Sequence, residues 1–300
     1  MKLWTWIKIY WIKFTTWLST GISMVVYNFH KSIKGIKTKK NISYGNKSNF
    51  AQKFDVHYPE NIMHDKPIIV YFHGGGWTAY SKHIFTTLTR RLAEMGYVVF
   101  NCNYRLAPKY KIDDIINDGV MAIKKAKEIA ADFAGDSSKI ILAGDSAGAH
   151  IASMIMAKAA SGDNKYKELY NNIKAMILLY GVYDLLTMLK SGFPNIKTYA
   201  SASIRGGINN LQEMEQLSPI KYDLSKFAPC LIASGEIDKL HTSQSQTMYN
   251  ALKNAGVNAH KVFFNKDEFK AMHSYMIIDG ISTNVKTLHE IKKFLKEVVC

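Results

Sequence analysis

The sequence predicts a fold of the α/β class, with a mainly parallel sheet buried between layers of helices. Seven short runs rich in β-branched or aromatic residues alternate with amphipathic helical patterns along residues 54–300. Strands that are apolar throughout, rather than at every second position, indicate a sheet covered on both faces. With 47% hydrophobic residues, the 300-residue chain can also form a large core, which excludes a disordered chain.

The expected elements follow from these patterns. We expect strands at 54–58, 68–72, 97–102, 139–143, 175–180, 229–234 and 260–264. We expect helices at 82–95, 113–134, 147–161, 242–254 and 281–298. The last helix is predicted from apolar residues that recur on one face, namely Val285, Leu288, Ile291, Leu295 and Val298. Residues 187–218 interrupt the alternation, so we expect a small helical cap inserted into a domain at 54–300.

The net charge of +15 is concentrated at the start of the chain. Residues 1–54 contain ten lysines and no acidic residue, whereas the remainder carries 29 basic and 24 acidic residues. Lysines outnumber arginines 35 to 4 and no nucleic-acid-binding motif is present, so we expect no nucleic acid as partner. Cys102, Cys230 and Cys300 lack paired spacing, which argues against a disulfide framework or a thiolate metal site.

Residues 1–30 have the composition of a membrane-associated segment. Four tryptophans lie among lysines in the first 17 residues, and residues 14–29 carry no formal charge. We therefore expect a membrane anchor at 1–30, single-pass or interfacial, followed at 31–53 by a basic connector or a contribution to the cap. The predicted location is membrane-associated, with the membrane surface as a partner. A cleaved signal segment, which would make the protein secreted, and a helix packed on the domain are the alternatives.

Residues 144–148, with the sequence GDSAG, directly follow an apolar run and open a helical pattern. A serine at such a tight strand-to-helix turn is held above the sheet edge, and the flanking glycines let the chain bend and the helix pack closely. The helix N-terminus adds positive potential beside it. We interpret Ser146 as a nucleophile; a serine that only caps the helix is the alternative.

Three consecutive glycines, Gly74, Gly75 and Gly76, follow His73 at the end of another apolar run. Without side chains in the way, their backbone N–H groups can approach a ligand closely, as an oxyanion hole requires. We interpret His73 as a residue that orders this loop rather than as a base. A glycine-rich turn without a ligand is the alternative.

An acid and a base are expected after Ser146, because the triad in this kind of fold runs serine, acid, histidine. Asp238 follows the predicted strand 229–234, and His273 follows the last predicted strand by a loop. Both therefore lie at the carboxyl ends of strands, the edge at which sites form in such sheets. Glu236 and Asp267 compete with Asp238 for the role of the acid.

Six motifs in order resemble those of the α/β-hydrolases, in the hormone-sensitive-lipase-like branch. They are HGGGW (73–77), NYRLAP (103–108), GDSAGAH (144–150), LSP (217–219), SGEID (234–238) and MHSY (272–275). This branch includes bacterial carboxylesterases and arylacetamide-deacetylase-type membrane esterases. The resemblance covers residues 54–300 and implies an α/β-hydrolase fold with Ser146, Asp238 and His273 as the catalytic triad. It also implies an oxyanion hole formed by the backbone N–H groups of Gly75, Gly76 and Ala147.

The implied activity is that of a serine hydrolase that cleaves carboxylic esters, of short or medium acyl chains or lipophilic, through an acyl-enzyme. Its substrate would be a small-molecule or lipid ester, and His273, oriented by Asp238, would take the Ser146 proton. We expect no cofactor and no metal, since the sequence has no metal-spaced cluster. Two alternatives stay open: an amidase, deacetylase or peptidase that uses the same site, and an inactive hydrolase fold that acts as a membrane-tethered binding module.

Overall fold

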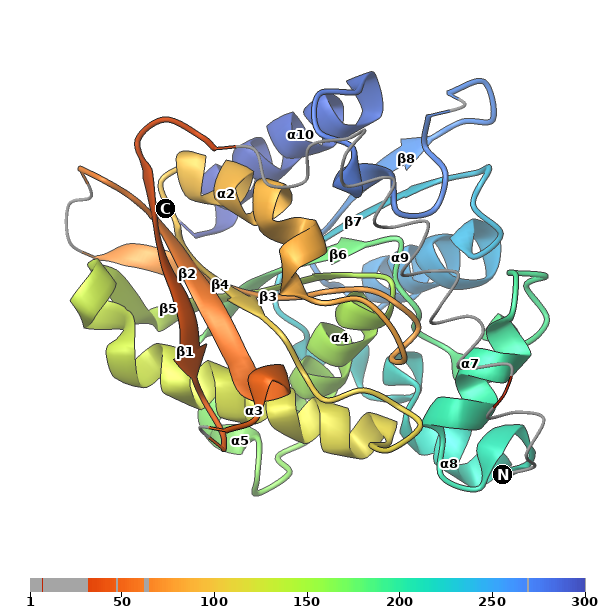
Figure 1. Cartoon of the computed structure of the whole chain (residues 1–300). Coiled ribbons are helices and arrows are strands. Elements are labelled where there is room, and N and C mark those ends of the chain that lie inside the picture. Colours follow the sequence, from red (N-terminus) through yellow and green to blue (C-terminus); the bar gives the residue numbers. More distant parts are fainter. Residues whose placement is uncertain (1–6, 8–31, 47, 62–64, 269, 300) are drawn as a thin grey trace.

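The computed structural model describes residues 7, 32–46, 48–61, 65–268 and 270–299, and places one sheet between two layers of helices (Figure 1). The strands are β1 (Ile36–Ser43), β2 (Lys53–Pro59), β3 (Lys66–Phe72), β4 (Val98–Cys102), β5 (Gly135–Asp145), β6 (Ile173–Leu179), β7 (Cys230–Gly235) and β8 (Ala259–Phe264). The helices are α2 (Thr86–Glu94), α3 (Ile112–Ile129), α4 (Ala147–Ala160), α5 (Lys167–Tyr170), α6 (Leu185–Met188), α7 (Ile196–Ser203), α8 (Leu211–Gln216), α9 (Thr247–Asn254) and α10 (Ser282–Val298).

The sheet of the described residues has the strand order β1-β2-β4-β3-β5-β6-β7-β8. β2 pairs antiparallel with β1 and with β4, and the pairs from β4 to β8 are all parallel. The carboxyl ends of the parallel strands meet at one edge, where the loops after β3, β5, β7 and β8 come together. This topology confirms the predicted α/β class with a mainly parallel sheet.

Each face of the sheet has its own apolar core. On β3, Ile68, Val70 and Phe72 belong to the core shared with α3, α4 and α9, whereas Ile69 and Tyr71 belong to the core shared with α2 and α10. Successive residues of a strand point to opposite faces, so a run without polar residues serves both cores. Figure 1 shows the two helical layers on opposite sides of the sheet.

The seven predicted strands and five predicted helices are all present, with two changes at helix starts. A 3-10 turn at Lys82–Phe85 precedes α2, and a π-helical turn at His241–Gln246 precedes α9. The buried face of α10 differs from the prediction at its first turn, where Val285 is 54% exposed. Asn284 is buried there instead and donates to the Met276 carbonyl (3.1 Å), because this turn packs on a loop rather than on the sheet.

Strand β1 lies within residues 31–53, for which the sequence predicts a connector or a contribution to the cap rather than a strand. Lys37, Lys39 and Lys40 project from it into solvent, and the strand forms one edge of the sheet. Charged residues on an edge strand discourage pairing with another chain. The same lysines conceal the strand in the sequence, because they interrupt its apolar pattern.

The prediction of a membrane-associated location is contradicted in the part of the chain that the structure describes. None of its helices is both long enough and apolar enough to cross a lipid bilayer. The anchor was predicted at residues 1–30, which lie outside the described residues except for Ile7.

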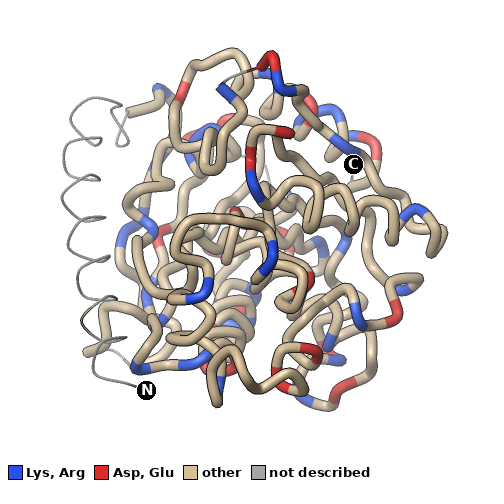
Figure 2. Tube along the Cα trace, turned by 90° about the vertical axis from the view of Figure 1, so that its right-hand side faces the viewer, with Lys and Arg blue, Asp and Glu red and all other residues tan. Residues whose placement is uncertain are grey.

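The charges of the described domain are mixed rather than separated by sign. Figure 2 shows basic and acidic residues interspersed along the chain on the face that it presents. Some of them form exposed ion pairs, including Lys37–Glu60 and Arg205–Asp113. Exposed pairs add little to stability, so the two apolar cores account for most of what holds the fold.

Candidate active site

Ser146 lies at the junction of β5 and α4, where the chain reverses sharply. Its φ of 49° and ψ of −117° fall outside the helical and extended regions, which is typical of a serine on a nucleophile elbow. The turn depends on the flanking glycines. A Cβ on Gly148 would collide with the Phe72 carbonyl oxygen, and one on Gly144 would collide with the Gly148 backbone. Because the two glycines have no Cβ atoms, the start of α4 can pack against the end of β3.

The structure brings together the three side chains predicted as a triad. His273 Nε2 lies 2.9 Å from Ser146 Oγ, and His273 Nδ1 lies 2.7 Å from Asp238 Oδ2. The Asp238 side chain is 1% exposed, whereas both competing acids, Glu236 and Asp267, are exposed to solvent. A buried carboxylate against Nδ1 keeps a proton on that nitrogen, so Nε2 can accept one from the serine.

Close packing of two loops sets Asp238 beside His273. A Cβ on Gly235, the last residue of β7, would collide with the Ala271 carbonyl oxygen, so the loop that carries His273 passes directly over the end of β7. Asp238 Oδ1 accepts the Leu240 N–H (2.9 Å), which leaves Oδ2 for the histidine. Both ends of the acid–base pair are thereby fixed to the same strand end.

Gly75, Gly76 and Ala147 border the space in front of Ser146. Gly75 and Gly76 have φ values of 115° and 57°, which glycine adopts readily and other residues adopt only rarely. Ala147 is the first residue of α4, so its N–H belongs to the helix end that has no acceptor within the helix. All three residues predicted for the oxyanion hole therefore line the same cavity as the serine.

Asp145 also belongs to this site, although no pattern in the sequence predicts a role for it. It is 1% exposed, and its Oδ1 accepts hydrogen bonds from the Gly74 N–H (2.8 Å) and the Tyr71 hydroxyl (2.9 Å). Oδ2 has no hydrogen-bond partner among the described residues. Burial raises the pKa of the Asp145 carboxyl to about 7, although both hydrogen bonds act to lower it. Asp145 thus joins the glycine loop after β3 to the turn that carries Ser146.

His73 is buried under this loop and lies 4.2 Å from the Tyr104 ring, in a stacked arrangement. Its Nδ1 lies 2.7 Å from the Gly74 carbonyl oxygen, and burial lowers the pKa of the imidazole to about 4. A neutral, stacked histidine with a bond to the loop backbone supports the interpretation that His73 orders the loop.

A second buried histidine links the elbow helix to the end of the predicted cap. Trp77 Nε1–H donates to His150 Nδ1 (3.3 Å), and His150 Nε2 lies 2.7 Å from the Leu217 carbonyl oxygen. Burial lowers the pKa of His150 to about 4, so the ring stays neutral and can make both bonds. The glycine loop, α4 and residue 217 are therefore held in one network.

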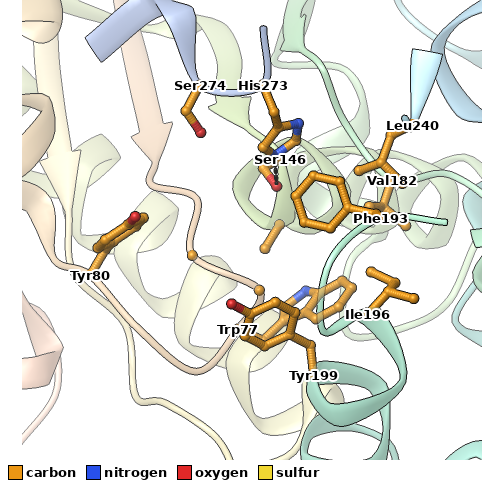
Figure 3. A pocket seen from close by; sticks show the side chains of 13 residues that line it. Trp77, Tyr80, Ser146, Val182, Phe193, Ile196, Tyr199, Leu240, His273 and Ser274 are labelled. Atoms are coloured by element: carbon orange, nitrogen blue, oxygen red, sulfur yellow. Dashed lines mark hydrogen bonds between the residues drawn. The ribbon is translucent and has the colours of Figure 1, made fainter. Parts of the chain in front are cut away.

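A cavity of about 100 Å³ opens in front of Ser146 (Figure 3). Most of its wall is apolar and comes from Trp77, Val182, Phe193, Ile196, Tyr199 and Leu240. Phe193, Ile196 and Tyr199 belong to the predicted cap, which forms short helices here. Nowhere in the described residues do three His, Cys, Asp or Glu side chains gather as metal ligands.

A comparison with protein families identifies the family of this chain. A family model described as BD-FAE matches residues 54–252, which is more than half of the chain. This chain belongs to the BD-FAE family. As a BD-FAE member it is similar to the isoprenylcysteine alpha-carbonyl methylesterase ICME of Arabidopsis thaliana, with 27% identity over 83% of this chain and 59% of the relative. This chain therefore covers less than two thirds of that relative's length.

Two further relatives of this BD-FAE chain carry other names. Kynurenine formamidase of Danio rerio is 27% identical over 74% of this chain and 71% of its own length. Esterase LipQ of Mycobacterium tuberculosis is 28% identical over 72% of this chain and 54% of its own length.

Solved structures share the fold of this BD-FAE chain. Esterase B from Lactobacillus rhamnosis superposes with a TM-score of 0.80 at 18% identity, covering 98% of this chain and 96% of that structure. A bacterial heroin esterase gives a TM-score of 0.77 at 20% identity, covering 92% and 90%. These likenesses confirm the α/β-hydrolase fold that the sequence motifs implied.

Proposed function

We propose that this BD-FAE protein hydrolyses carboxylic esters, with Ser146 as nucleophile, His273 as general base and Asp238 as the residue that orients the base. The observation that carries the proposal is the row of hydrogen bonds from Asp238 through His273 to Ser146, which ends at an apolar cavity. Relatives and fold neighbours named as esterases support the same chemistry. We take residues 54–300 as the hydrolase domain and 187–218 as its cap.

The first half of the reaction forms an acyl-enzyme. His273 Nε2 takes the proton of Ser146 as Oγ attacks the ester carbonyl carbon, and the carbonyl oxygen becomes negatively charged. The N–H groups of Gly75, Gly76 and Ala147 bind this oxyanion. In a serine protease of another fold, loss of one oxyanion-hole donor slows the reaction by about 10²–10³-fold. The imidazolium then gives its proton to the alcohol oxygen as the carbon–oxygen bond breaks.

The second half releases the acid. His273 takes a proton from a water molecule, whose oxygen attacks the acyl carbon on Ser146. The new oxyanion occupies the same three N–H groups, and the imidazolium returns the proton to Ser146 Oγ as the acyl group leaves. Asp238 stabilises the imidazolium in both halves, because its buried carboxylate lies 2.7 Å from Nδ1.

The size of the cavity favours a short acyl group. It measures about 100 Å³, whereas an apolar cavity of about 150 Å³ is known to hold a benzene ring. We therefore infer that short acyl groups fit best. The apolar walls favour an acyl group without charge.

A second candidate is the hydrolysis of small amides, because the same apparatus performs acyl transfer from nitrogen. The likeness to a relative named kynurenine formamidase, over 71% of its length, favours this candidate. In that case, His273 would protonate a departing amine instead of an alcohol.

The test uses the full chain, treated with a fluorophosphonate and assayed on p-nitrophenyl esters from acetate to octanoate and on formanilide. We expect labelling of Ser146 and fastest turnover from acetate to butyrate. The Ser146→Ala variant serves as the blank for both measurements. A folded protein that is neither labelled nor active would contradict the proposal and favour an inactive hydrolase fold that binds ligands. Formanilide cleaved faster than every ester would favour the second candidate.

A further inference from the structure

We infer that Phe193 and Tyr199, both from the predicted cap, are positioning residues that hold His273 and Gly76 in their working places. The inference rests on the proposed esterase function and adds two residues to its machinery. Two contacts carry the inference. The base, His273, is in contact with the ring of Phe193, and Gly76 of the oxyanion loop is in contact with the ring of Tyr199. These two contacts have different consequences for the reaction, which makes them separable by experiment.

His273 stands between two aromatic rings. The ring centroid of Phe193 lies 4.7 Å from that of His273 at an interplanar angle of 67°, and Tyr180 lies at 5.1 Å and 62°. Both are edge-to-face contacts at favourable distances. The hydrogen bond to Asp238 fixes one nitrogen but allows the ring to swing about that bond. Phe193 limits this swing, and Figure 3 shows its ring beside His273 and Ser146.

Tyr199 packs on the backbone of Gly76. A Cβ placed on Gly76 would lie only 2.9 Å from Tyr199 Cγ and 3.0 Å from Cδ1, so the tyrosine ring occupies the space where a side chain would be. A run of three glycines has no side chains with which to fix itself. Asp145 holds Gly74 at the start of the run, and Tyr199 supplies packing two residues further along.

Phe193 and Tyr199 are part of one short segment that is itself fixed to the domain. The Asn195 carbonyl, between them in sequence, accepts the Tyr199 N–H (3.1 Å) at the first turn of α7. At the end of the same helix, the Ala202 carbonyl accepts a hydrogen bond from Lys111 Nζ, and Ala202 is fully buried. Because the segment is attached to the domain outside the site, it can hold His273 and Gly76 in place.

The two contacts predict different kinetic defects. His273 must first take the serine proton and then give a proton to the leaving alcohol, and the second transfer matters most for a poor leaving group. The oxyanion forms with any ester, so its stabilisation matters equally for good and poor leaving groups. Loss of the Phe193 ring, which packs on His273, should thus slow the cleavage of benzyl acetate more than that of p-nitrophenyl acetate. Loss of the Tyr199 ring, which packs on Gly76, should slow the cleavage of both esters equally.

The test measures kcat and KM of full-chain Phe193→Leu and Tyr199→Leu on these two acetates. For Phe193→Leu we expect kcat/KM to fall about 3- to 10-fold more on benzyl acetate than on p-nitrophenyl acetate. For Tyr199→Leu we expect about 3- to 10-fold lower kcat on both esters, with little change in KM. Phe193→Tyr and Tyr199→Phe keep a ring in place and should recover most of the loss.

Ile196→Ala is the matched control, because Ile196 lines the same cavity. It enlarges the cavity and should act mainly through KM. Thermal unfolding of each variant separates misfolding from a kinetic defect. If the Phe193 and Tyr199 variants behave like Ile196→Ala, or the conservative variants recover nothing, the inference is overturned. A wild-type protein that cleaves neither ester contradicts the proposed function instead.

Discussion

Lys82 Nζ lies 2.7 Å from Asp55 Oδ1 in the interior of the protein, with 0% and 3% of the two side chains exposed. The same carboxylate oxygen accepts the Asn41 N–H (2.7 Å), and Asn41 Oδ1 accepts a hydrogen bond from Lys82 Nζ (3.0 Å). The pair thus joins the turn before α2 to β2 and to the irregular part of β1. Removing one member would leave the other charge buried without compensation.

Lys82→Met should therefore lower the free energy of unfolding by about 3–5 kcal/mol. Urea unfolding at neutral pH measures this change. The control is Lys37→Met, which breaks the Lys37–Glu60 pair, whose side chains are both 53% exposed. This control should cost less than about 1 kcal/mol, because water screens the pair. An equal decrease in the free energy of unfolding of the two variants would show that the buried pair contributes no more than the exposed pair.

Asp238→Asn should reduce kcat for p-nitrophenyl acetate by about 10⁴-fold, because an amide no longer favours the proton on Nδ1 of His273 or stabilises the imidazolium. Glu236→Gln and Asp267→Asn remove the competing carboxylates, which are exposed, and should retain activity. Steady-state kinetics of the three variants decide the assignment. Activity that survives in Asp238→Asn and is lost in either control would assign the acid elsewhere.

The free energy of unfolding of Asp145→Asn, relative to that of the wild type, should increase as the pH rises. Burial raises the pKa of this carboxyl from 3.8 to about 7, so the folded state binds its proton more tightly than the unfolded state does. Below the pKa that the Asp145 carboxyl has in the unfolded state, this carboxyl does not reduce the stability of the wild type. As the pH rises from there toward 7, the free energy of unfolding falls by on the order of 4 kcal/mol. An asparagine does not titrate and loses nothing over this range.

Urea unfolding of both proteins at pH 5 and at pH 8 measures the effect of Asp145→Asn. The difference in free energy of unfolding between variant and wild type should be larger at pH 8. A difference that does not change between the two pH values would mean that Asp145 ionises normally in the folded protein.

Gly148→Ala should lower kcat/KM by about 10²-fold, because its Cβ would collide with the Phe72 carbonyl oxygen and displace α4 together with Ser146. Gly119→Ala is the matched control within a helix, since its Cβ would meet the flexible end of the Ile155 side chain at 2.8 Å. Alanine is also favoured over glycine in helices by about 1 kcal/mol. Ester kinetics should show the control close to wild type, and a similar defect in both would remove the special role of Gly148.

Much of the fold, and the residues that meet at the candidate site, could be predicted because the signals are local. The apolar runs predicted seven strands, and the turn at residues 144–148 identified Ser146 as a candidate. Asp238 and His273 were identified by their places after strands. Placement after a strand does not by itself separate Asp238 from Glu236, and the motif resemblance favours Asp238. Burial of Asp238 and exposure of Glu236 in the structure agree with that choice.

The remaining features depend on packing between distant segments. The contacts of Phe193 with His273, Tyr199 with Gly76 and Gly74 with Asp145 each join residues far apart in the chain. The periodic patterns of the sequence carry no information about which distant residues are in contact. The strand β1 was missed for another reason, because the lysines that suit an exposed edge also resemble a linker.

The close approach of Gly235 to Ala271 divides the candidate site into two mechanical units. Asp238 and His273 both extend from the end of β7 and the loop packed on it, whereas Ser146 belongs to β5 and α4. In the sheet, Ser146 is connected to the end of β7 only across β6, through the hydrogen bonds from the Ser146 N–H to the Leu179 carbonyl and from the Tyr180 N–H to the Ala233 carbonyl. We therefore expect a displacement of the β7 end to change the distance from His273 to Ser146 before it changes the distance from Asp238 to His273.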